Sequence, residues 1–460
     1  MGQELDLSIN NGLVVAPQGR VHADIGIREG KIVALAGSGE LGRSKRTIDA
    51  SGKWVLPGVI DPHVHFHMWE RPFEGDVISE TRAAAAGGVT TIGLYVLLKD
   101  DGQTAAIFER GGGRIDSAAE YREEYERHAV VDAYLQVMLP EENLDRSILA
   151  AHREGIRFFK VTWGRKQFND KWVLRAFETI ARLGKPCRAM VHAENLDLCE
   201  EYIERVRSSG RNDPAAWTDG RPSFCEAEHM DRYIRLAVQA RCPLYFVHIT
   251  IGEGVDIVAR AKAQGADVIG ETCPQYLTHT VDTPVFQKAP QLAKVNPPIR
   301  DAASNQKLWE GLGQGILECV GSDHSPRTLA EKKGTVWEVP PGLGNTTEMI
   351  LPVLISEGVS KGRLSLEQAV AISAYNPARR FGLYPRKGVL CPGSDADVVI
   401  VDPNKKVKLD ASLLHSRSDY SIYEGWEFQG WPTCTIVRGR VVVEDGEIVC
   451  EGGTGLCLTS

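Results

Sequence analysis

The segment V-L-P-G-V-I-D-P-H-V-H, residues 55–65, is a short apolar run that ends in two histidines, His63 and His65. Side chains alternate along a β-strand with period two, so both imidazoles of an H-x-H pair face the same side. Two surface histidines would give the same pattern, which makes the pair alone a moderate indication of a metal site. The rest of the chain has to decide between these interpretations.

Four further polar residues close short apolar runs in the same way: Lys160, His192, His248 and Asp323. Their runs are R-F-F-K (157–160), C-R-A-M-V-H-A-E (187–194), L-Y-F-V-H-I-T (244–250) and L-E-C-V-G-S-D (317–323). Three more apolar runs, at 90–96, 132–139 and 267–274, bring the number of predicted strands to eight. Stretches with helical spacing separate them, as in residues 231–241. The pattern predicts a (β/α)₈ TIM-like barrel, whose strand carboxyl ends build the active site.

The two ends of the chain differ from its middle. Residues 5–48 alternate with period two between glycine turns, and similar short strands return from about residue 388 onward. We therefore expect a small β-sandwich domain built from residues 1–56 and 387–460, beside a catalytic barrel of residues 57–386. The pattern does not give the pairing between the two halves.

Composition indicates a large globular enzyme. The chain has 460 residues, 43% of them hydrophobic, and a formal net charge of -8, which argues against nucleic acid or an anionic membrane as the main partner. Its N-terminus lacks the pattern of a secretory signal, and no run approaches the ~18 apolar residues of a membrane span. The ten cysteines form no C-x-x-C pair and are expected to be reduced thiols. We expect a cytoplasmic protein.

A single histidine at a strand end is more often structural than a ligand, but the set of strand-end residues is a stronger indication. Lys160 differs from the others because an ammonium has no lone pair to give a metal. Its neighbours Phe158, Phe159 and Val161 make an unpaired buried charge costly. Carbamylation by CO₂ would turn the cation into an anionic group able to bridge two metal ions. The alternative is a lysine whose ammonium extends to the solvent at the barrel mouth.

Several motifs resemble those of the amidohydrolase superfamily, and within it the cyclic amidohydrolases: hydantoinases, dihydropyrimidinases, allantoinases and dihydroorotases. The resemblance covers nearly the whole chain, and the C-terminal motifs are most similar to the hydantoinase and dihydropyrimidinase branch. The motifs include L-P-G-V-I-D-P-H-V-H (56–65), A-A-G-G-V-T-T (85–91), V-H-A-E-N (191–195), G-E-T-C-P-Q-Y-L (270–277), K-V-N-P-P-I-R (294–300), G-S-D-H-S-P (321–326) and S-D-Y-S-I-Y-E-G-W-E-F-Q-G (418–430).

By this resemblance, one metal ion would be held by His63, His65 and Asp323, a second by His192 and His248, and carbamylated Lys160 would bridge both. Zinc is the first expectation, with manganese and iron as alternatives, because these ligands suit several divalent ions. Two such ions about 3.5–4 Å apart activate a water and polarise the scissile carbonyl. Asp323 would take the proton of that water and pass it to the leaving nitrogen. The resemblance also implies a homotetramer.

The chain departs from the family at the positions expected to contact the substrate. Arg165 stands where hydantoinases usually have a tyrosine, and it would stabilise the oxyanion, bind an acidic substituent, or lie in solvent. His67 matches none of the residues that the subfamilies carry after the H-x-H pair. Asn296 resembles dihydroorotase and could present an amide to an imide ring, or act only as a turn residue. Gly342 begins a glycine-rich segment where the family closes on its substrate.

We therefore expect a hydrolase that opens the C–N bond of a cyclic amide, ureide or imide, acting on a small molecule. Hydantoinase or dihydropyrimidinase activity leads, and allantoinase or hydrolysis of another ring follows. Dihydroorotase activity comes last because its substrate-binding arginine is absent. A tetrameric scaffold that has lost its metals is the alternative from another class, and the presence of all six ligand residues argues against it.

Overall fold

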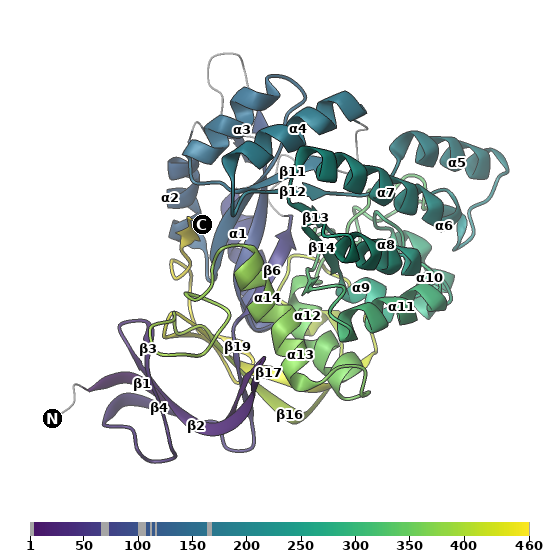
Figure 1. Ribbon diagram of the computed structural model, residues 1–460. Coiled ribbons are helices and arrows are strands. Elements are labelled where there is room, and N and C mark those ends of the chain that lie inside the picture. The colour runs from purple at the N-terminus through teal and green to yellow at the C-terminus, as the bar shows by residue number, and fades with distance from the viewer. Residues whose placement is uncertain are drawn as a thin grey trace.

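A computed structural model describes residues 4–65, 73–99, 107–110, 113–115, 117–162 and 168–459. Its central feature is a barrel of parallel strands (Figure 1). Each strand pairs with the next one, and the bridge between Val64 and His324 brings the first and last strands together. The predicted (β/α)₈ architecture is confirmed. The strands are β6 (Val59–Val64), β7 (Val89–Lys99), β10 (Asp132–Met138), β11 (Phe158–Thr162), β12 (Arg188–Val191), β13 (Leu244–Phe246), β14 (Val268–Thr272) and β15 (Cys319–Val320).

Helices surround the barrel, as Figure 1 shows. The helix predicted at 231–241 is the second half of a longer helix that ends at Ala240, one residue earlier than predicted, because Arg241 takes a left-handed conformation with φ of 55°. The helices are α1 (Phe73–Ala86), α2 (Ala118–His128), α3 (Leu144–Arg153), α4 (Asp170–Leu183), α5 (Leu196–Ser208), α6 (Ala216–Asp219), α7 (Ser223–Ala240), α8 (Gly252–Ala263), α9 (Pro274–Thr278), α10 (Pro284–Lys288), α11 (Ala302–Gly313), α12 (Ile350–Val353), α13 (Leu366–Val370) and α14 (Asn376–Arg380).

Alternation of side chains along the strands decides what fills the barrel. On β11, Phe158 belongs to the apolar cluster inside the barrel, whereas Phe159 and Val161 pack in the core outside it. Lys160 therefore shares the inner face with Phe158. Tyrosine and methionine side chains of other strands fill the same interior, and Phe381, which follows α14, packs against Phe158 with ring centroids 4.8 Å apart. The barrel interior is thus a packed core that supports whatever lies at the strand carboxyl ends.

A second sheet joins the two ends of the chain, as the purple and yellow strands of Figure 1 show. The junction is the antiparallel pair of β5 and β16, in which Val398 lies opposite Pro57. Strands from both ends share one apolar core, which contains Ile9, Ile25 and Ile400 among others. The predicted sandwich is confirmed, and its strands are β1 (Leu5–Ala16), β2 (Gly19–Arg28), β3 (Lys31–Ala36), β4 (Ser44–Asp49), β5 (Trp54–Pro57), β16 (Val398–Lys408), β17 (Glu427–Val437), β18 (Arg440–Glu444) and β19 (Glu447–Ile448).

Three short strands extend the barrel sheet. A hairpin of β8 (Ile107–Arg110) and β9 (Gly113–Ile115) continues from β7. The last strand, β20 (Cys457–Leu458), pairs with β10 of the barrel and not with the sandwich. The division into residues 1–56 with 387–460 and 57–386 stays a prediction, with β20 as the part of the C-terminal segment that joins the barrel sheet.

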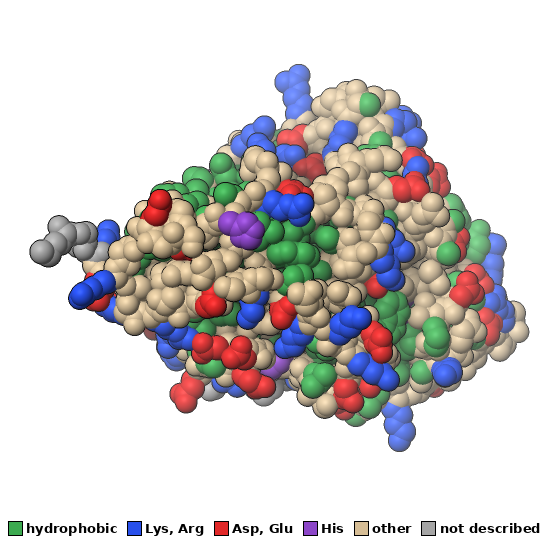
Figure 2. Space-filling model, turned by 90° about the horizontal axis from the view of Figure 1, so that it is seen from below, with side chains coloured by type: hydrophobic (Ala, Val, Ile, Leu, Met, Phe, Trp, Pro, Cys, Tyr) green, Lys and Arg blue, Asp and Glu red, His purple; other side chains and the backbone are tan. Residues whose placement is uncertain are grey.

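The surface carries both signs of charge. On the face shown in Figure 2, lysine and arginine side chains are intermixed with aspartate and glutamate. Within the part of the chain that the structure describes, no helix combines the length and apolar character needed to cross a membrane.

A buried ion cluster fastens the sandwich to the barrel. Lys387 Nζ lies 2.7 Å from Asp132 Oδ2 on β10, 2.5 Å from Asp397 Oδ2 and 3.2 Å from Asp395 Oδ2. Asp395 also pairs with Arg386 and with Lys31, which lies on β3. Burial alone would raise the pKa of Asp395, but Lys387 and the other two cations hold that pKa below its usual value. The cluster therefore needs Asp395 to be ionised.

Replacement of this carboxylate tests the cluster. We expect Asp395→Asn to lower the free energy of unfolding by roughly 2–3 kcal/mol at neutral pH, because charged hydrogen bonds are lost in a buried place. Since the folded-state pKa of Asp395 lies below the usual value of 3.8, this stabilisation is present above pH ~4 and is lost as the pH falls further. Denaturant unfolding at several pH values measures it. Asp6→Asn, in an exposed pair with Lys45, is the control and should change stability little; an equal loss there would contradict the assignment.

Candidate metal centre

The six residues singled out from the sequence all lie at the carboxyl ends of barrel strands. His63 is on β6, His65 is the first residue after that strand, and Lys160 is on β11. His192 follows β12, His248 follows β13 and Asp323 follows β15. His248 and Asp323 have positive φ values of 38° and 50°, which is uncommon outside glycine. Such backbone strain gathers at functional sites, where it directs side chains that a regular strand would turn elsewhere.

The first group consists of His63, His65 and Asp323. The Nε2 atoms of the two histidines are 3.0 Å apart, and Asp323 Oδ1 lies 3.3 Å from His63 Nε2 and 3.4 Å from His65 Nε2. These three side chains offer ligand atoms within 4.8 Å of one another. This close arrangement of two ring nitrogens and a carboxylate oxygen is what a divalent cation needs.

The second group consists of His192 and His248. Nδ1 of His192 faces Nε2 of His248 at 3.0 Å. The ring of His248 also stacks on that of His63, with centroids 5.2 Å apart, so the two groups are neighbours. The five side chains of the two groups therefore surround one space at the barrel mouth.

Lys160 lies with these groups, and only 2% of it is exposed. Its Nζ stands 4.7 Å from the ring centroid of Tyr95, a ring that stacks on His65 with centroids 4.9 Å apart. Burial lowers the pKa of Lys160 to about 8, against the opposing effect of Asp323 and Glu271. A fraction of the amine is therefore neutral near pH 7–8, which is the form that reacts with CO₂.

Burial also keeps the histidines neutral. It lowers the pKa of His65 and His192, and lowers that of His63 and His248 well below the usual value of 6.5, with the charge of Lys160 acting in the same direction. Neutral imidazoles have a lone pair to offer a cation. The sequence-predicted ligand set is thus brought together in a form suited to a metal.

Carboxylates behind the histidines orient the rings. Glu194 Oε2 lies 2.8 Å from His192 Nε2 and is held by Arg221, whose guanidinium keeps the pKa of Glu194 far below its usual range although burial acts the other way. Glu271 Oε1 lies 2.9 Å from His63 Nδ1 and accepts the His248 backbone N–H. Tyr245 Oη donates to the other oxygen of Glu271 at 2.7 Å. Burial raises the pKa of Glu271 to about 8, against these hydrogen bonds.

Sequence reasoning did not single out Glu194, Arg221, Glu271 or Tyr95. Two of them were visible in the motifs, since Glu194 lies two residues after His192 and Glu271 lies inside a strand where a carboxylate is costly. A charged residue in an otherwise apolar strand was the available signal. Arg221 lies in the loop before α7, far along the chain from His192, so no local pattern indicated it.

The structure describes two of the four residues that were expected to contact the substrate, Asn296 and Gly342. Asn296 is half-buried, and its Oδ1 is buried without a hydrogen-bond partner in the described part of the chain. Gly342 has φ of 119°, and its N–H donates to Lys294 O, two residues before Asn296. The next residue, Leu343, accepts the N–H of Ser325 and so connects this segment to that of Asp323. His67 and Arg165 lie outside the described residues.

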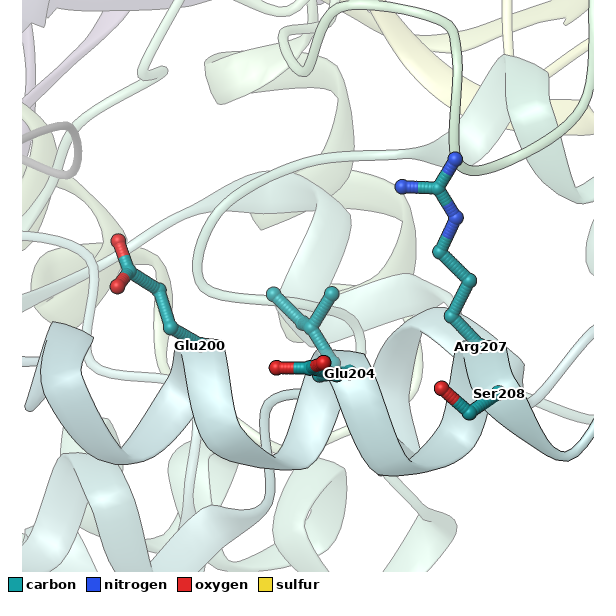
Figure 3. A pocket seen from close by; sticks show the side chains of 5 residues that line it. Glu200, Glu204, Arg207 and Ser208 are labelled. Carbon is teal, nitrogen blue, oxygen red and sulfur yellow. The ribbon is translucent and has the colours of Figure 1, made fainter.

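A separate hollow of about 560 Å³ lies along α5 (Figure 3). It is lined by Glu200, Ile203, Glu204, Arg207 and Ser208, which all belong to this helix. None of the six strand-end residues lines it, so it is distinct from the candidate metal centre.

Comparison with known proteins agrees with this geometry. Residues 162–442 match the amidohydrolase family. The chain is 34% identical to the L-hydantoinase of Paenarthrobacter aurescens, over 99% of this chain and 98% of the relative. Solved structures of a D-hydantoinase from a Bacillus sp. AR9 and a dihydropyrimidinase from Brevibacillus agri NCHU1002 both match with a TM-score of 0.88, at 33% and 31% identity, over 98% of each chain.

The chain therefore belongs to the amidohydrolase family. Its relatives place it in the hydantoinase branch of that family, as the sequence motifs predicted.

Metal binding is testable without any substrate. We expect a divalent metal ion to raise the melting temperature of chelator-treated protein, because a ligand that binds only the folded state stabilises it by about 2.7 kcal/mol at 100 times its Kd. His63→Ala should reduce the shift, whereas His22→Ala, at an exposed position of β2, should not. Differential scanning calorimetry measures both, and equal shifts in the two variants would argue against the assigned site.

Proposed function

We propose that this protein is a binuclear metal-dependent hydrolase that opens the amide C–N bond of a small cyclic amide, with hydantoins and dihydropyrimidines as its first substrates. One observation carries the proposal. His63, His65 and Asp323 lie beside His192 and His248 at the mouth of a barrel whose relatives are named hydantoinases and dihydropyrimidinases.

The side chains fit a pair of divalent ions. His63, His65 and Asp323 would hold one ion, His192 and His248 the other, and carbamylated Lys160 both. The facing nitrogens of each pair, Nε2 of His63 with Nε2 of His65 and Nδ1 of His192 with Nε2 of His248, lie 3.0 Å apart, so a cation between them would use both lone pairs. Imidazole, carboxylate and carbamate suit zinc first, and manganese or iron as well. When bound, the ions would lower the pKa of a water and polarise the scissile carbonyl.

Asp323 is the proposed proton carrier. Burial opposes its ionisation, but His63 and His65 hold its pKa below the usual value, so it is a carboxylate at neutral pH. It can accept the proton of the attacking water and donate it to the nitrogen that leaves when the ring opens. Without this transfer the leaving group would be an amide anion, a much poorer one.

The substrate would lie between the metal centre and the loops that carry Asn296 and Gly342. The unpartnered Oδ1 of Asn296 can accept an N–H of a cyclic ureide or imide. Gly342 donates its N–H to Lys294 O in the Asn296 loop, and a side chain there would meet Ser325 Oγ at 3.0 Å, so this segment packs tightly between that loop and the segment of Asp323. We propose Arg165 and His67 as the remaining substrate contacts, and a cytoplasmic homotetramer as the working form.

Ring opening by the metal-loaded protein tests the function. We expect turnover of dihydrouracil or a 5-substituted hydantoin of one hand, in preference to allantoin, dihydroorotate and a simple cyclic imide. Asp323→Asn should lower the rate by roughly 10²–10⁴-fold, because proton transfer is lost. Asp6→Asn, on the sandwich, should keep the native rate.

Each other outcome has a defined meaning. Turnover of allantoin or the imide alone would keep the hydrolase and replace the proposed substrate. No turnover of any of these rings by protein that carries metal would contradict the proposed substrates, whereas protein that takes up no metal would favour the scaffold.

The modification of Lys160 has its own test. We expect protein loaded with metal in ¹³C-bicarbonate to show a carbamate carbon signal in the NMR spectrum, because the buried amine with its pKa of about 8 is partly neutral. Lys160→Gln has similar length but no reactive amine, and should lack the signal and bind less metal. Lys294→Gln, another buried lysine, is the control. A carbamate signal that survives in Lys160→Gln would refute the bridge.

A further inference from the structure

We propose that Glu194 and Arg221 form a positioning pair for the second metal ion: the pair holds the His192 ring so that Nδ1 faces His248. This inference rests on the proposed function, because it assumes that His192 and His248 hold an ion. It adds a role for two residues that do not touch the ion themselves.

The contacts that carry the inference are short and buried. His192 Nε2 lies 2.8 Å from Glu194 Oε2. Arg221 donates two hydrogen bonds to the same carboxylate, from Nη2 to Oε2 at 2.5 Å and from Nε to Oε1 at 3.0 Å. Glu194 is 1% exposed and Arg221 5%. A two-point contact of this kind fixes the plane of the carboxylate as well as its position.

The fixed carboxylate determines which nitrogen of His192 carries the proton. A carboxylate facing Nε2 accepts a hydrogen bond, so the proton of the neutral ring lies on Nε2. The lone pair is then on Nδ1, which faces His248 Nε2 at 3.0 Å. A ring without this partner could turn or take the other tautomer, and either change would remove a ligand atom from the space between His192 and His248.

Arg221 is itself held by a network that reaches the other side of the site. Arg300 Nη1 donates to Arg221 O at 2.5 Å, and Arg300 Nη2 lies 3.2 Å from Glu226 Oε2. Glu226 in turn accepts the backbone N–H of Thr250, two residues after His248, at 2.8 Å. Arg300 belongs to the same loop as Asn296, so the network connects this loop to the backbone beside both histidines.

The first metal position has a different support. There, Glu271 faces His63 Nδ1 at 2.9 Å, and among the described residues it is held by Tyr245 and by the His248 backbone, not by an arginine. Loss of Glu194 should therefore weaken one metal position and spare the other. A merely structural role would weaken both together.

Stepwise metal binding tests the pair. Chelator-treated native protein should bind two equivalents of Co²⁺ in competition with a chromophoric chelator. In Glu194→Gln we expect one of the two equivalents to bind roughly 10–100-fold more weakly, with the other almost unchanged. The visible absorption bands of the weakened equivalent should also change in this variant, because the His192 ring is a ligand at one position only.

Two further variants serve as comparisons. Arg221→Lys keeps the charge but not the two-point contact, and should weaken binding of the same metal equivalent as Glu194→Gln, to a smaller extent. Glu228→Gln is the matched control, since Glu228 accepts from Asn195 Nδ2 at 2.9 Å and pairs with Arg232 at a half-exposed place. It should bind both equivalents as the native protein does.

The outcomes separate the inference from the proposed function. Native affinity of both equivalents in Glu194→Gln, or equal weakening of both, would overturn the positioning role and leave the hydrolase standing. Failure of the native protein to bind two equivalents would overturn the binuclear site and the inference with it.

Discussion

The approach of lone-pair nitrogens at the barrel mouth is the constraint on which the rest of the site depends. His63 Nε2 lies 3.0 Å from His65 Nε2, and His192 Nδ1 lies 3.0 Å from His248 Nε2. Two such nitrogens can share one proton, but buried imidazoles cannot each carry a charge at this separation. A cation between them would resolve the conflict for both pairs. Burial of these rings therefore fits the metal-dependent chemistry of the family, because it keeps the facing nitrogens free of protons.

The rest of the fold serves to keep these groups in place. The packed barrel interior supports the strand ends from below, and positive φ values turn His248 and Asp323 toward the common space. Buried carboxylates orient the rings from behind, Glu194 with an arginine and Glu271 with a tyrosine. At a greater distance, the Lys387 cluster fastens the sandwich to β10. The buried charges of Glu194 and Lys387 are tolerated because a group of opposite charge faces each of them, Arg221 in the first case and Asp395 in the second.

The sequence predicted the barrel and the six candidate ligands because each candidate ends an apolar run, and within a regular strand alternation then determines the face on which it lies. Lys160 shows this, since its inward direction follows from Phe158 and Phe159 on either face of β11. Features that depend on distant contacts could not be predicted. The β5–β16 junction joins segments separated by more than three hundred residues, and Arg221 meets Glu194 only through the loop before α7. The pairing of β20 with β10 has no local pattern at all.

The central claim is that two metal ions at the strand ends carry out ring opening together. The most direct measurement is a titration of metal-free protein with Zn²⁺, in which bound metal and hydrolysis of dihydrouracil or a 5-substituted hydantoin are followed on the same samples. We expect activity to stay low through the first equivalent, to rise with the second and then to level off. Full activity in the metal-free protein, or full activity at one equivalent, would contradict it.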